Sequence, residues 1–203
     1  MKSSLPRTAL LLLSFALLSS CLSVETRVEL SDAQRGELTY IYTVDRDLLE
    51  AEVFDREAEN WPIPIARRDF ELFADAIAGA ELKQYAREDS EQRSVVTARY
   101  SFASIEDLRR LLSMRESPSI EPGEGEFGLR FQLTPLGVAG LTEGEREFLQ
   151  SYLRESSFSF TVTTPEPIVS TSQGEAQGRT LSVEHSLQEL LDRPEPLFLE
   201  LAW

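Results

Sequence analysis

The chain has 203 residues, with 20 basic residues against 35 acidic residues and a formal net charge of −15. A protein this acidic repels nucleic acid and anionic lipid head groups, so we expect no nucleic-acid partner and attribute the charge to solubility. The hydrophobic fraction of 41% and its clear periodicity exclude a disordered chain.

The first twenty residues have the pattern of an export signal. Lys2 and Arg7 precede an apolar stretch from Ala9 to Leu18, and small residues follow it. A basic start, a short apolar stretch and small residues before a cut site define a secretory signal. A membrane-spanning helix needs about 20 apolar residues, so this segment predicts a signal peptide instead.

The signal ends at a cysteine. The run Leu18-Ser19-Ser20-Cys21 resembles a bacterial lipobox. In proteins with that motif a signal peptidase cuts before the cysteine, whose thiol carries a diacylglyceryl group. The resemblance implies a cleaved signal peptide over residues 1–20, lipidation of Cys21 and a single domain over residues 21–203. The alternative is an ordinary signal peptide with a chance cysteine near its end.

Lipidation would make the membrane the first partner of the chain. Two acyl chains give a stable anchor, at about 0.8 kcal/mol for each buried CH2 group. We therefore expect a domain held by lipid on Cys21 and facing the periplasm or the cell surface. Leu22, and not Asp, follows the cysteine, which favours an outer membrane where the host has one. No second cysteine is present to form a disulfide.

Cleavage at this point would leave one domain without a covalent cross-link. The remaining 183 residues carry 18 basic and 35 acidic side chains, a net charge of −17. A chain of this length buries roughly 70% of its unfolded surface, so a hydrophobic core can stabilise it.

The N-terminal half of this domain predicts a hairpin and a helix. Apolar residues alternate over residues 24–31 and 38–44, and turn-forming residues lie between them. This pattern favours two antiparallel strands joined by a turn. A helix follows and ends near Gly79. Its apolar stripe comprises Phe70, Phe73, Ala74 and Ile77.

The middle of the chain alternates strands with helices. Residues 93–102 and 127–133 have the two-residue period of strands, and a loop is expected over residues 117–125. Ser104 is a good N-cap for a helix between these strands, and Thr142 opens a capping box for another helix through Leu153. The inner face of the first of these helices is predicted to contain Ile105, Leu108 and Leu112.

The C-terminal part predicts three more strands, over residues 158–163, 181–185 and 197–203, and a short helix from Ser186. A chain that ends in an apolar strand is usually tied into a sheet. Taken together, the elements predict a single α+β domain, with a mostly antiparallel sheet and about three helices packed on one face.

Few residues are candidates for chemistry. His185 is the only histidine and shares a strand face with Leu181 and Val183, so a structural role is favoured over a general base or a pH sensor.

Carboxylates are so numerous in the chain that their proximity in sequence does not indicate a catalytic pair. The crowded sets are Asp45/Asp47, Glu121/Glu124/Glu126 and Glu143/Glu145/Glu147. Phosphate-binding, hydrolase and metalloprotease motifs are absent. We therefore predict no catalytic, metal-binding or cofactor-binding residues, and no enzyme.

Three aromatic residues have alternative interpretations. Trp61 lies between a charged stretch and two prolines, where it either covers the core beside the first helix or anchors a partner or lipid. Tyr40 and Tyr42 share one strand face. They either line the core or line a cavity between sheet and helices, with their hydroxyls serving a ligand.

The layout resembles the LppM-type domain of mycobacterial envelope lipoproteins. A strand pair over residues 25–44 begins just after the cysteine. Near the C-terminus a strand ends at Pro165, a turn with Gly174 and Gly178 follows, and a second strand precedes a closing one. The resemblance implies an α+β lipoprotein domain that binds lipid or glycolipid, and it implies no catalytic residue.

The predicted function follows from the anchor and from the absence of catalytic motifs. We expect a lipid-anchored envelope lipoprotein that acts as a non-enzymatic binding or assembly module for an unknown envelope protein or lipid. One alternative is a carrier or sensor of lipid or another amphiphile, with an apolar cavity. The third is a hydrolase that uses His185 or a carboxylate pair.

Overall fold

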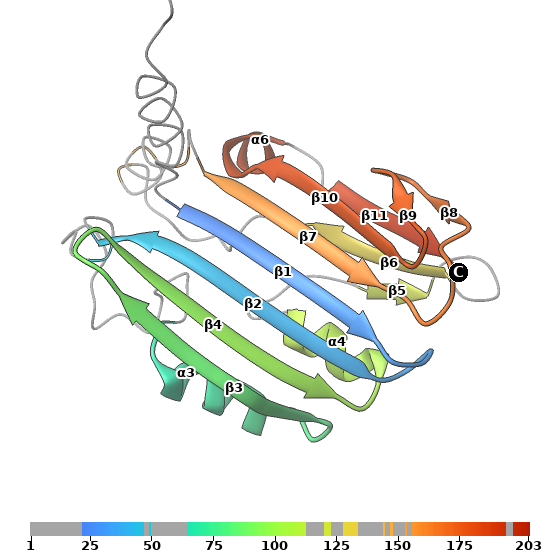
Figure 1. Cartoon of the computed structure of the whole chain (residues 1–203), viewed down its shortest axis with the longest axis horizontal. Coiled ribbons are helices and arrows are strands. Elements are labelled where there is room, and N and C mark those ends of the chain that lie inside the picture. Colours follow the sequence, from blue (N-terminus) through green and yellow to red (C-terminus); the bar gives the residue numbers. More distant parts are fainter. Residues whose placement is uncertain are drawn as a thin grey trace, which may run out of the picture.

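The computed structural model describes residues 22–46, 49, 65–112, 120–122, 128–133, 144, 147, 153, 156–193 and 197–203. Cys21 and Trp61 lie outside these residues, as does most of the helix predicted to begin at Thr142. The fold consists of a large sheet with a second layer against one of its faces (Figure 1).

Seven strands form the large sheet. In spatial order they are β3 (Ala80–Asp89), β4 (Arg93–Phe102), β2 (Gly36–Asp45), β1 (Leu22–Leu30), β7 (Ser157–Thr163), β10 (Thr180–Ser186) and β9 (Ala176–Gln177). A smaller sheet contains β5 (Ile120–Pro122), β6 (Gly128–Leu133), β11 (Leu197–Ala202) and β8 (Ser170–Thr171). The helices in the described part of the chain are α3 (Arg67–Asp75), α4 (Ile105–Leu112) and α6 (Leu187–Asp192).

Strand β1 lies at the centre of the large sheet. It pairs antiparallel with β2 from Leu22 opposite Val44 to Leu30 opposite Gly36, which confirms the predicted hairpin. Its other edge pairs parallel with β7. The sheet is therefore mostly antiparallel with one parallel pair in the middle, and this pair joins the two ends of the sequence.

Hydrogen bonds within a short turn close the β1–β2 hairpin. The amide of Ser31 donates to the carbonyl of Arg35 at 2.8 Å. The Asp32 carboxylate accepts from the amides of Gln34 and Arg35, both at 2.8 Å. These backbone donors favour the ionised carboxylate and lower the pKa of Asp32 to about 2. The turn residues singled out in the sequence therefore form the turn.

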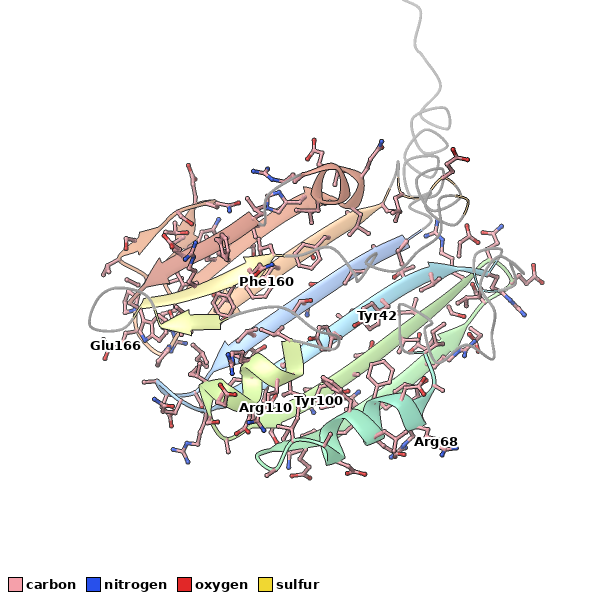
Figure 2. All side chains as sticks on the ribbon, turned by 180° about the vertical axis from the view of Figure 1, so that it is seen from behind. Tyr42, Arg68, Tyr100, Arg110, Phe160 and Glu166 are labelled. Carbon is pink, nitrogen blue, oxygen red and sulfur yellow. The ribbon has the colours of Figure 1, made fainter. Side chains whose placement is uncertain are left out.

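The second layer consists of helices over one part of the large sheet and of the smaller sheet over another part. Helices α3 and α4 cover the part of the large sheet formed by β2, β4 and β3, and the smaller sheet covers the part formed by β7 and β10 (Figures 1 and 2). The expectation of about three helices on one face was therefore only partly right. Alternation shows that residues 128–133 and 197–202 are strands, but it does not show which sheet they join.

One continuous core lies between the layers. Helix α3 contributes Phe70 and helix α4 contributes Leu108 and Leu111, while the Phe131 ring of β6 packs 5.1 Å from the Phe160 ring of β7. Leu112, which was predicted on the inner face of α4, is half-buried and packs against this core, whereas Leu111, which was not predicted there, is fully buried. A helix this short tolerates a wide apolar stripe, so the spacing alone did not fix its inner face.

Strand β3 was not predicted from the sequence. It forms one edge of the large sheet and, among the described strands, pairs only with β4. The pairing register shifts between Leu82 and Gln84, which leaves Lys83 as an extra residue. A bulge of this kind breaks the two-residue period, and charged residues outnumber apolar ones along the strand.

We predict opposite outcomes for two leucine-to-alanine substitutions in the two helices. Leu108 of α4 has no exposed surface, whereas Leu72 of α3 is 57% exposed. Leu108→Ala should lower the free energy of unfolding by about 2–5 kcal/mol, because it removes buried methyl groups and leaves a cavity. Leu72→Ala should change it by less than about 0.5 kcal/mol. Urea denaturation of both variants measures the difference, and equal losses would mean that α4 does not pack as described.

Candidate functional site

The first strand that the structure describes, β1, begins directly after the predicted lipidation site. Leu22, the residue after Cys21, is the first residue of β1 and is only 2% exposed. It lies opposite Val44 of β2, and the next residue, Ser23, is already paired with both Thr43 and Ser157. The backbone at this point is thus fixed between two neighbouring strands, and no spacer separates Cys21 from the central strand of the sheet.

A cluster of tyrosine rings lies under the helices. Tyr40 and Tyr42 of β2 point to the same face because they are two residues apart, and their rings stack with centroids 5.8 Å apart. Tyr100 of β4 meets the Tyr40 ring edge-on at 6.4 Å. Figure 2 shows Tyr42 and Tyr100 on the face of the sheet that the helices cover. The cluster is buried, so the core role favoured from the sequence holds for Tyr40 and Tyr42.

Two of these tyrosine hydroxyls form hydrogen bonds from the sheet to the helices. Tyr40 donates to the carbonyl oxygen of Leu111 in α4 at 2.9 Å, and Tyr100 donates to that of Phe70 in α3 at 3.2 Å. A third tyrosine, Tyr85 of β3, donates to the carbonyl oxygen of Ile65 at 2.5 Å. These hydroxyls satisfy backbone acceptors of the second layer and are therefore not directed at a ligand.

His185 lies near the end of β10, opposite Phe158 of β7 and on the same face as Leu181 and Val183. It is half-buried, and its Nε2 is enclosed without a hydrogen-bond partner among the described residues. Burial lowers the pKa of His185, and Glu189 opposes this effect, so the imidazole is neutral at pH 7. A catalytic histidine needs a nucleophile within hydrogen-bond reach, and none of the hydrogen bonds described here supplies one to Nε2.

The acidic residues that the structure describes do not form a recognisable centre. Asp45 ends β2 opposite Arg93 of β4. Asp47 and most of the two glutamate runs lie outside the described residues. Among the residues that are described, no three His, Cys, Asp or Glu side chains are placed to hold a metal ion. The helices of the described residues are all too short or too polar to cross a membrane.

The outer face of the large sheet is a polar surface that the sequence analysis did not single out. The helices and the smaller sheet lie against the opposite face (Figure 1). The register places a row of polar residues across the middle of this surface: Gln84, Arg99, Thr39, Arg27, Thr161 and Ser182. The hydroxyls of Thr161 and Ser182 are 2.8 Å apart. The sequence does mark this surface, because the polar residues that alternate with the apolar ones in each strand all lie on it.

The fold is that of an α+β domain in which helices and a small sheet share one face of a larger mixed sheet. No protein-family model and no curated protein matches the sequence. Among solved structures, the NMR structure of the folded domain of LppM from Mycobacterium tuberculosis is similar, with a TM-score of 0.52 and 10% sequence identity. The match covers 89% of this chain and 88% of that chain. It confirms the fold implied by the resemblance in sequence layout, and at this identity it shows the fold alone.

The two tyrosine–helix hydrogen bonds should differ in their contribution to stability. The carbonyl of Leu111 lies in the last turn of α4, where carbonyls lack an intrahelical partner, whereas that of Phe70 lies inside α3. Tyr40→Phe therefore leaves a buried acceptor unpaired and should cost about 1–3 kcal/mol, against about 0.5–1.5 kcal/mol for Tyr100→Phe. Chemical denaturation of both variants gives the comparison, and a larger loss in Tyr100→Phe would contradict it.

Alkaline pH should unfold the domain through the tyrosine cluster. Burial raises the pKa of Tyr40, Tyr42 and Tyr100 above the usual value of about 10. The unfolded chain loses these protons first, so the contribution of the three tyrosines to stability is constant below pH about 10 and falls above it. The loss is up to about 1.4 kcal/mol per pH unit for each buried tyrosine. Denaturation at several pH values tests this, and Tyr42→Phe should reduce the slope by one tyrosine's share.

Proposed function

We propose that this chain is a lipid-anchored envelope lipoprotein whose domain acts as a non-enzymatic binding or assembly module. Residues 1–20 are removed, Cys21 carries the diacylglyceryl group, and the domain faces the periplasm or the cell surface. The observation that carries the proposal is the placement of β1. It begins at Leu22, so a cut before Cys21 spares every described strand and helix.

The sequence and the fold support this proposal independently. The order of basic residues, apolar stretch and Leu18-Ser19-Ser20-Cys21 favours lipidation over simple secretion. The likeness to the folded domain of LppM agrees with the LppM-type layout of the strands. Leu22 after the cysteine favours an outer membrane in a host that has one.

A binding module fits the described interior better than a carrier does. A carrier needs an apolar cavity between the sheet and the helices. Tyr40 and Tyr42, the alternative lining for such a cavity, are instead buried in a cluster with Tyr100. The hydroxyls of Tyr40 and Tyr100 donate to helix carbonyls. A hydrolase would require a partner for His185, and its enclosed Nε2 has none among the described residues. We therefore assign recognition of the partner to the polar outer face of the large sheet.

Metabolic labelling with a clickable fatty acid tests the anchor. The full-length chain, expressed in a bacterium, should become labelled, and its mature form should have the mass of residues 21–203 plus a diacylglyceryl group. Cys21→Ser removes the thiol that forms the thioether, so label and mass increase should both disappear.

A matched control moves the thiol without changing the number of cysteines. In the double variant Cys21→Ser/Ser23→Cys the cysteine lies two residues beyond the cut site, and neither label nor cleavage should occur. An unlabelled wild-type chain, or equal labelling of the double variant, would rule out the lipobox.

A further inference from the structure

We infer that one end of the large sheet rests against the lipid surface, with the strands directed away from it. This end, termed the proximal end, consists of the start of β1, the start of β7, the β3–β4 turn (Ser90–Gln92) and helix α6. The inference rests on the proposed lipidation of Cys21 and adds an orientation that lipidation alone does not specify.

The length of the tether is the first argument. Adjacent Cα atoms are about 3.8 Å apart, so the Cα of the acylated residue lies within that distance of Leu22. Leu22 is buried and paired inside the sheet, so it cannot unwind to lengthen the tether without breaking the central strand. A flexible linker would leave the domain free to rotate, but here the acylated residue is followed directly by the paired residue Leu22.

The register shows which elements share this end. Opposite the start of β1, strand β2 ends at Asp45, which is paired with Arg93 at the start of β4. The amide of Arg46 donates to the carbonyl of Gln92 at 2.9 Å, which fixes the β3–β4 turn beside them. On the other side, the amide of Leu187 in α6 donates to the carbonyl of Ser156 at 3.0 Å, just before β7. Figure 1 shows the β1–β2 turn at the opposite end of the sheet.

Charge does not set this orientation. The proximal end carries the bases Arg46, Arg93 and Arg193, but acids accompany them: Asp45, Asp89, Glu91 and Glu189. A membrane-binding surface that works by electrostatics needs a cluster of basic residues without this compensation. The covalent lipid therefore holds the proximal end at the head groups, and raising the salt concentration should not release it.

The opposite end is held away from the membrane. Strand β1 has 9 residues, and at about 3.3 Å per residue its far end lies up to about 26 Å from Leu22. The β1–β2 turn with Gln34 is therefore the distal end of the domain. A glutamine in each of two hairpin turns, Gln92 and Gln34, is exposed and gives a matched pair of label positions.

Lipid-based quenching tests the orientation. The acylated full-length chain, carrying Gln92→Cys or Gln34→Cys, is labelled with a fluorescent maleimide and placed in vesicles of phosphatidylethanolamine, phosphatidylglycerol and a head-group nitroxide lipid. Acylation consumes the thiol of Cys21, so each variant has one reactive site. The label at Gln92 should be quenched several-fold more than the label at Gln34, at low and at high salt. Equal quenching, stronger quenching at Gln34, or a ratio lost in salt would overturn the inference.

A linker variant separates tether length from other causes. Inserting about 16 Gly and Ser residues between Cys21 and Leu22 gives an r.m.s. reach of about 22 Å, and quenching at Gln92 should fall towards that at Gln34. Unchanged quenching would show that something other than the tether orients the domain.

Mass spectrometry distinguishes a failure of the proposed lipidation from a failure of the proposed orientation. A chain that is not acylated would show no lipid mass on Cys21, and the vesicles would not retain it. Both proposals would then fail together.

Discussion

The pairing of β1 with both β2 and β7 holds this molecule together. Without it the large sheet would separate into β3-β4-β2 on one side and β7-β10-β9 on the other. The antiparallel pair with β2 forms locally through a short turn, whereas the parallel pair with β7 joins residues more than a hundred positions apart. Closing such a long loop is entropically costly, so the register of β7 depends on the core that forms beneath it.

The second layer shows how that core is completed. Tyrosine rings on β2 and β4 provide apolar area, and two of their hydroxyls bind helix carbonyls, of which that of Leu111 lies in the last turn of α4 without an intrahelical partner. Aromatic residues with a polar tip suit this position because they join an apolar layer to a hydrogen-bonded backbone. On the other half of the sheet, the Phe131 and Phe160 rings pack against each other, and these two side chains carry no polar group.

Several elements of the fold were predictable because their physical signals are local. The β1–β2 hairpin, the Ser104 cap and the inward faces of β4, β7 and β10 follow from periodicity and turn chemistry. The pairing of β6 and β11 into a separate sheet was not predictable, because alternation does not identify a partner strand. Strand β3 was missed because its bulge interrupts the period. For the site, the sequence predicts lipidation at Cys21, and only the structure shows that the next residue, Leu22, is buried in a central strand.

With the lipid anchor proposed above, the irregular edge strand β3 would lie beside the sheets of neighbouring molecules. Molecules anchored in one leaflet meet one another at high local concentration and with their sheets side by side, and an open strand edge is then a template for unwanted pairing. In β3 the extra residue Lys83 distorts the edge, and the exposed charges of Glu81 and Arg87 oppose a second strand. At the other margin β9 is only two residues long, too short to recruit a neighbour. Neither β3 nor β9 therefore offers a long, regular edge to a second copy of the sheet.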